Sequence, residues 1–243
     1  MSVPLWATEL ARAFWEKAGE PESFPRTLRR AIARAVRLSI VLLPRLSVRA
    51  ALDWLQNCGL VCELPGEDRP LRACLVARSG HGVALVDGSD RDAEQRFSIA
   101  HELAHFLRDY WSLRRRILKR LGAEALQVLD GERPPTSQER FHALLRDVPL
   151  GFHLHLMERD RDGNPVSSSI AQAEDDADRL AYELLAPADH VLGNGKPKSR
   201  QELERRLREF YGLPGVQASR YAGLLLPQMK CDPLLIRLRS VMQ

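Results

Sequence analysis

The chain has 243 residues, of which 44% are hydrophobic, and a formal net charge of +4 at pH 7. This length suffices for one large domain or two small ones, so the chain does not need disulfides to stabilise a small core. No apolar run approaches the length of a membrane span and the N-terminus lacks a signal-peptide pattern, which indicates a cytoplasmic protein without a membrane partner. Because the positive residues are mostly arginines interleaved with acids, direct nucleic-acid binding is disfavoured, with the basic run at 114–120 as the exception.

The first third of the chain predicts helices followed by a small sheet. Apolar periodicity predicts helices over 5–18 and 26–57. Strands are expected near 60–64, 71–77 and 82–87, because turn signals separate these apolar runs. Their order predicts a small antiparallel sheet directly before the next helix, with an edge that an extended peptide could join.

The next helix, predicted over 93–111, carries the sequence HELAH at 101–105. His101 and His105 lie four residues apart on one face, along the edge of the apolar stripe, and can therefore hold one metal ion. In zinc hydrolases with this spacing the intervening acid, here Glu102, accepts a proton from the attacking water. The alternative interpretation is two partly buried histidines that bond backbone carbonyls.

A third ligand is needed, because catalytic zinc sites usually have three protein ligands. The helix predicted over 173–187 offers acids at its start. Its periodicity points Asp175 away from the buried stripe and places Glu174 and Asp176 on opposite flanks of that stripe. Both remain candidates from the spacing alone, and a simple interaction with the helix dipole is the alternative role for either.

A long segment at 112–168 separates the two helices and predicts an insertion that forms one wall of the substrate cleft. Within it, 151–157 alternates as a strand does, with His153 and His155 on the same side. That pair could form a second metal site or donate a hydrogen bond to a transition state. Because no third partner is evident, the sequence favours two ordinary half-exposed strand residues.

The C-terminal part follows a Gly- and Pro-containing linker at 193–198. Helices are predicted over 199–210 and 216–225, and a plain helical hairpin is favoured over a DNA-binding module because no base-reading polar face is evident. These features predict three parts. They are an N-terminal helical segment at 1–58, a core at 59–192 that contains the insertion, and a C-terminal helical segment at 193–243.

Two stretches together, QRFSIAHELAHFL at 95–107 and DDADRLAYELLAP at 175–187, resemble the ImmA/IrrE family of bacterial metallopeptidases. The resemblance implies a zincin-like metallopeptidase core with a small antiparallel sheet beside the helix that carries HELAH. It makes His101 and His105 zinc ligands, Glu102 the general base and Asp176 the third ligand. The family usually has glutamate at the position of Asp176, and Glu174 is the alternative ligand.

The function that this resemblance implies is a zinc-dependent endopeptidase with one Zn²⁺ per chain, Mn²⁺ being the alternative metal. Its expected partner is a protein substrate, a helix-turn-helix transcriptional repressor in stress response or mobile-element control. Two other classes stay open. One is a non-proteolytic regulator that binds DNA or protein around a structural zinc, and the other is a toxin-antitoxin component.

Overall fold

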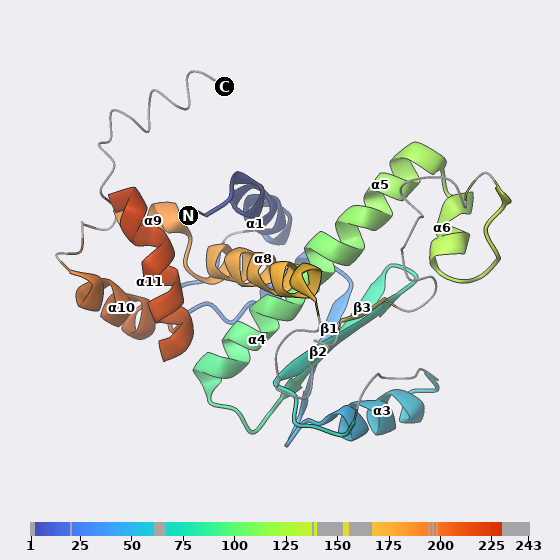
Figure 1. Ribbon diagram of the computed structural model, residues 1–243, viewed down its shortest axis with the longest axis horizontal. Helices are drawn as coiled ribbons and strands as arrows, with labels where there is room; N and C mark the ends of the chain where they lie inside the picture. The colour runs from blue at the N-terminus through green and yellow to red at the C-terminus, as the bar shows by residue number, and fades with distance from the viewer. Residues whose placement is uncertain are drawn as a thin grey trace.

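The computed structural model describes most of the chain between residues 3 and 229. The described residues are 3–19, 21–60, 67–137, 139, 153–155, 167–193, 195, 197 and 199–229. Helices form most of this part, and a four-stranded sheet lies beside them (Figure 1). The prediction of a mostly helical α+β fold is confirmed.

The helices in chain order are α1 (Leu5–Ala18), α2 (Arg29–Ala35), α3 (Val48–Asn57), α4 (Asp92–His105), η1 (Phe106–Trp111), α5 (Ser112–Leu121), α6 (Glu124–Leu129), α8 (Ser168–Leu185), α9 (Ala188–Gly193), α10 (Arg200–Glu209) and α11 (Gly215–Met229). The strands are β1 (Leu38–Leu43), β2 (Ala73–Arg78), β3 (His81–Asp87) and β4 (His153–His155). The helices predicted over 5–18, 93–111 and 173–187 are present, the last of them beginning at Ser168. The two predicted C-terminal helices are present as α10 and α11.

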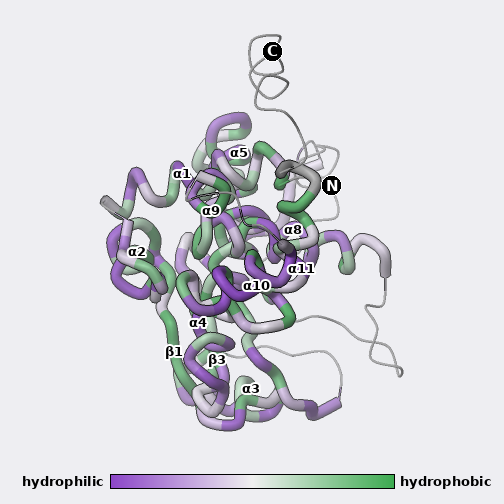
Figure 2. The backbone as a smooth tube through the Cα atoms, turned by 90° about the vertical axis from the view of Figure 1, so that its left-hand side faces the viewer, coloured by the Kyte–Doolittle hydropathy of each residue, from purple (hydrophilic) through white to green (hydrophobic). Residues whose placement is uncertain are grey.

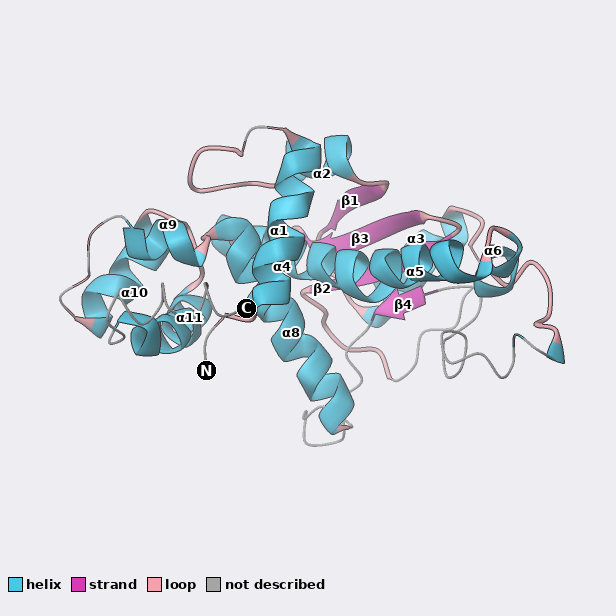
Figure 3. Cartoon of the chain, turned by 90° about the horizontal axis from the view of Figure 1, so that it is seen from above, coloured by secondary structure: helices cyan, strands magenta, loops and turns pink. Residues whose placement is uncertain are grey.

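The sheet has the order β1-β3-β2-β4 and is mixed (Figure 3). β2 pairs antiparallel with β3 on one side and with β4 on the other, whereas β1 pairs parallel with β3. The prediction of a purely antiparallel sheet is therefore wrong. The parallel pair arises because α3 lies between β1 and the β2–β3 hairpin in the chain, and parallel neighbours need such a crossover.

The prediction of helices over 26–57 is confirmed for α2 and α3 but is wrong between them, where Leu38–Leu43 forms β1. Apolar spacing in this stretch also fits a helix, but the β-branched Ile40 and Val41 favour a strand and Pro44 stops the run. Pairing with β3 satisfies the backbone hydrogen-bonding groups of this segment. Its strand conformation therefore depends on a partner elsewhere in the chain. Of the strand predicted near 60–64, residues 61–64 lie outside the described part.

The central strands separate two apolar cores, because successive side chains of a strand point to opposite faces. Leu75 and Ala84 pack in the larger core, which contains the buried stripe of α4. Cys74 and Leu85, each one residue away, pack with α3 on the other face. A residue of β4 that lies opposite Leu75 therefore faces α4.

The β2–β3 hairpin is held close to the helix that follows α4. Ser79 and Gly80 form its two-residue turn with φ values of 49° and 80°, the left-handed backbone of a type I′ turn. The amide of Gly80 donates a hydrogen bond to the Tyr110 hydroxyl at 2.6 Å. Gly82 lies so near Phe106 that an added Cβ would be 2.7 Å from its ring. The sheet and the helix therefore approach closely beside the HELAH sequence.

The helical layer is built on the packing of α4 against α8, with α1 on α8 (Figure 3). α4 continues through η1, a wide π-helical turn, into α5 along one line (Figure 1). Apolar side chains of α10 and α11 join the same core as α1 and α8, while the rest of α10 is strongly hydrophilic (Figure 2). The larger core thus contains residues of all three predicted parts of the chain, and the boundaries near residues 58 and 193 stay predictions.

None of the helices among the described residues combines the length and apolar composition that crossing a bilayer requires.

Candidate metal centre

The two histidines of HELAH project from the end of α4 towards α8. Their Nε2 atoms lie 3.2 Å apart, and the His105 side chain is 1% exposed whereas that of His101 is 16% exposed. Glu174, in the N-terminal half of α8, reaches the same point. Its Oε2 lies 3.2 Å from Nε2 of His101 and its Oε1 lies 3.7 Å from Nε2 of His105.

His155 reaches these residues from the sheet. β4 pairs with β2 so that His155 lies opposite Leu75, and this register turns its ring towards α4. The ring stacks on that of His105 with centroids 3.4 Å apart, and its Nε2 lies 2.7 Å from Oε1 of Glu174. Three stretches of the chain, from α4, β4 and α8, therefore meet at one point.

His101, His105, His155 and Glu174 could together hold a metal ion. One ligand atom from each lies within 4.8 Å of the corresponding atoms of the others. Three imidazole nitrogens and one carboxylate oxygen suit borderline divalent cations such as zinc, and the same donors also bind other first-row transition metals. The donor set fits such an ion without identifying it.

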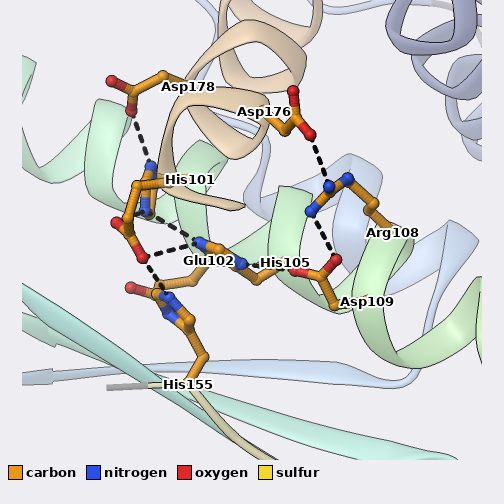
Figure 4. Close-up of polar contacts among 9 residues, drawn as sticks. His101, Glu102, His105, Arg108, Asp109, His155, Asp176 and Asp178 are labelled. Atoms are coloured by element: carbon orange, nitrogen blue, oxygen red, sulfur yellow. Dashed lines mark hydrogen bonds and ion pairs between the residues drawn. The ribbon is translucent and has the colours of Figure 1, made fainter. Parts of the chain in front are cut away.

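Each of the three imidazoles is held at its other nitrogen by a carboxylate (Figure 4). Nδ1 of His101 lies 2.9 Å from Asp178, Nδ1 of His105 lies 2.7 Å from Asp109, and Nδ1 of His155 lies 3.2 Å from Glu102. A carboxylate that accepts the Nδ1 proton fixes the ring and leaves Nε2 free to bind a metal. This pattern is typical of histidine ligands in metal centres.

The structure does not bring Asp176 to the histidines. Its Oδ2 accepts a hydrogen bond of 2.6 Å from Arg108, whose other nitrogen donates to Asp109 at 2.7 Å (Figure 4). Gln172 donates to the second oxygen of Asp176. Asp176 is therefore linked through Arg108 to Asp109, the carboxylate that holds His105. The acid that joins the histidines is Glu174, the alternative that periodicity had left open.

Glu102 lies inside this site, as its place between the two histidines of α4 predicts. The residue is 3% exposed, and its Oε2 lies 3.2 Å from Nδ1 of His155. The carboxylate thus lies beside the cluster without belonging to the group of four donors. This position is compatible with an acid that exchanges a proton next to a metal.

His155 was not predicted as a member of the site, because the sequence favoured an ordinary half-exposed strand residue at this position. Alternation in 151–157 correctly placed His153 and His155 on one side of a strand, of which 153–155 are described. The missing information was the partner of that strand, because only pairing with β2 decides which histidine reaches Glu174. His153 lies opposite Ala77, where its ring is 5.6 Å from that of Tyr110.

The pKa values of the three histidines differ because their buried rings contact different charges. Burial lowers the pKa of His101, but hydrogen bonds to Asp178 and Glu174 outweigh it and raise the pKa to about 10. Burial also lowers the pKa of His155, and the charge and hydrogen bond of Glu102 together with Glu174 raise it to about 9. Burial and the two neighbouring histidines hold the pKa of His105 well below 6.5. The two imidazoles that contact Glu174 most closely thus have raised pKa values, and the more buried His105 has a lowered one.

The cluster is partly exposed to solvent. The side chains of His101, Glu174 and His155 are 16%, 13% and 17% exposed, in contrast to His105 beneath them. Arg220 of α11 approaches the rim of the site, with one nitrogen 3.7 Å from Asp178. A small molecule or an extended chain would thus meet His101, Glu174 and His155 first.

Neither a protein-family model, nor a curated protein, nor a solved structure matches this chain. Its chemistry is accordingly inferred from the residues of the site itself.

Proposed function

We propose that the protein is a metal-dependent endopeptidase. The observation that carries this proposal is the position of Glu102, a buried carboxylate beside a cluster in which His101, His105 and Glu174 converge. A general base must lie within reach of the metal without occupying it, and the HELAH spacing provides that arrangement on one helix.

In this proposal His101, His105 and Glu174 hold the ion, Zn²⁺ in the first place and Mn²⁺ as the alternative. When bound, such an ion polarises a carbonyl and increases the acidity of water. Glu102 takes one proton from the attacking water and gives it to the leaving amine, while the new C–O bond forms and the peptide C–N bond breaks. Asp178 and Asp109 keep His101 and His105 in the tautomer that binds metal.

The substrate proposal comes from the resemblance of the two helical sequences to the ImmA/IrrE family, and it is a helix-turn-helix transcriptional repressor. Incubation of the metal-loaded protein with repressors encoded beside its gene, followed by intact-mass analysis, tests it. A pair of fragments whose masses add up to the repressor plus one water supports the proposal. Absence of metal-dependent fragments from every such repressor contradicts it.

Glu102→Gln tests the hydrolytic proposal. Glutamine retains an oxygen that can accept from His155 but cannot accept a proton, so we expect unchanged metal content and cleavage of fluorescein-labelled casein reduced by about 10²-fold to 10⁴-fold. His81→Ala is the matched control, because His81 is exposed on the hairpin, far from the cluster in the chain. Full cleavage by Glu102→Gln would reject Glu102 as the base.

A second candidate function is a non-proteolytic regulator with a structural metal, and His155 is the observation in its favour. Four protein ligands are typical of structural zinc sites, whereas catalytic sites keep one position open. This candidate predicts stoichiometric metal in the wild-type protein with no cleavage that depends on Glu102. Measurement of metal content and casein cleavage on the same preparation separates the two functions.

A further inference from the structure

We infer that His155 is an exchangeable fourth ligand, which occupies the position that a substrate carbonyl or an inhibitor must take at the metal. The inference rests on the proposed function, because it assigns His155 to the regulation of access to that same site. β4 would thereby keep the centre closed until a molecule competes for its place.

The three imidazoles of the cluster share one pattern of polar partners. Each has a carboxylate at Nδ1 and turns Nε2 towards Glu174 or the neighbouring imidazole. In its neutral form, a histidine whose Nδ1 proton is fixed in this way presents a free lone pair at Nε2. His155 therefore has the environment of a ligand, whereas His153, two residues earlier on the same face, lies outside the group of four donors.

The contact that would close the centre also engages the proposed base. Oε2 of Glu102 lies 3.2 Å from Nδ1 of His155. The same imidazole would therefore fill one coordination position of the metal and hydrogen-bond one oxygen of Glu102. Removal of His155 from the metal would release both at once. The single displacement would thus give a four-coordinate ion an open position and free Glu102 to accept a proton.

His155 belongs to the element of the sheet best suited to move. β4, of which residues 153–155 are described, lies at the end of the strand order and, among the described residues, pairs only with β2. Leu154 packs against the core under α3, but its side chain is only partly buried. Edge segments with few apolar contacts open at lower free energy than central strands. His101 and His105, in contrast, are fixed on a helix that packs against both the sheet and α8.

The same geometry revises the prediction that a peptide joins the sheet beside the metal. β4 covers the edge of β2, and a peptide can pair with β2 only if β4 leaves it. Displacement of β4 by an extended peptide would remove His155 and place the peptide backbone next to the metal ligands. The proposed substrate and the fourth ligand therefore compete for one place.

The test uses full-length protein loaded with Co²⁺, whose visible absorption weakens as its coordination number increases. Wild type, His155→Ala and His155→Gln are titrated with acetohydroxamate, which binds metals through oxygen, and His153→Ala is the matched control from the same strand. We expect His155→Ala and His155→Gln to bind metal at least about tenfold more weakly, since loss of a ligand costs no less than loss of its support. We also expect both to bind acetohydroxamate at lower concentration than wild type and His153→Ala.

Unchanged metal affinity and acetohydroxamate binding in both His155 variants would overturn the inference. So would a loss of casein cleavage in these variants at an unaltered Co²⁺ spectrum, because His155 would then assist the reaction without binding the metal. The weaker metal binding and the tighter acetohydroxamate binding expected above support the fourth ligand even if no variant cleaves casein. If the wild-type protein also cleaves none of the repressors tested above, the endopeptidase proposal fails and the assignment of His155 stands.

Discussion

α4 and β4 both supply imidazoles to the candidate metal centre, but the two elements bring them there by different physical means. The helical period alone places His101 and His105 on one face of α4, and any helix with this sequence would do so. His155 depends on the register of β4 against β2, and a shift of one residue would turn it to the opposite face. Ligands supplied by local geometry should therefore be robust, and those supplied by sheet pairing should be adjustable.

The largest effect is expected for His105→Ala, which removes one of the two imidazoles that α4 supplies. This ring is the most buried of the cluster and contacts His101, His155 and Glu174 at once. We expect the variant to lose stoichiometric metal, which elemental analysis of the purified protein would measure. Metal content equal to that of the exposed-site control His81→Ala would show that α4 does not anchor the ion.

The two acids of α8 provide the next test. Glu174→Gln should weaken metal binding by about tenfold or more, because it removes the charge of the one carboxylate that lies within 3.7 Å of Nε2 of all three imidazoles. Asp176→Asn is the matched variant, and it should change affinity much less because Asp176 contacts Arg108. Competition with a chelating dye would measure both affinities. The opposite order of effects would restore Asp176 as the third ligand.

Asp178→Asn tests the supporting carboxylates. Asparagine keeps the size of the side chain but removes the charge that holds the Nδ1 proton of His101, and loss of such a partner weakens metal binding by about 10-fold to 100-fold. Asp175→Asn, three residues earlier on the exposed side of α8, should have no effect on the same chelator competition. Equal affinities of the two variants would remove Asp178 from the site.

The smallest effect concerns the attachment of the sheet to the helix. Tyr110→Phe leaves the buried amide of Gly80 without its acceptor, and we expect the free energy of unfolding to fall by about 1–3 kcal/mol. Urea unfolding would measure this loss, while the metal stoichiometry of the folded protein should not change. A loss of metal at unchanged stability would instead show that the hairpin directly controls the register of β4.

The sequence predicted those parts of the fold and site that depend on neighbouring residues. HELAH indicated His101, Glu102 and His105, and turn signals between apolar runs indicated the hairpin strands β2 and β3. The choice between Glu174 and Asp176 was not predictable from α8 alone, because it depends on which flank of α8 packs towards α4. Asp176 lies on the flank that faces Arg108, and only the packed pair of helices reveals it.

Long-range pairing explains the other differences. β1 has the composition of a buried segment that fits either a helix or a strand, and its parallel partner lies 44 residues further along the chain, since Leu38 pairs with Gly82. β4 has the alternation of a strand, but its partner β2 lies far upstream, beyond the whole of α4 and α5. Such contacts are properties of the complete fold and leave no local signal in either strand.

The four donors come from segments that are distant in the chain, so an ion bound by them would act as a cross-link between the sheet and two helices. A ligand that binds only the folded state shifts the unfolding equilibrium by an amount that grows with the logarithm of its free concentration. Thermal denaturation should therefore record occupancy of the centre directly. Chelation would loosen the attachment of β4 before it affects the α4–α8 pair. The melting temperature of the protein would then report the free concentration of the metal.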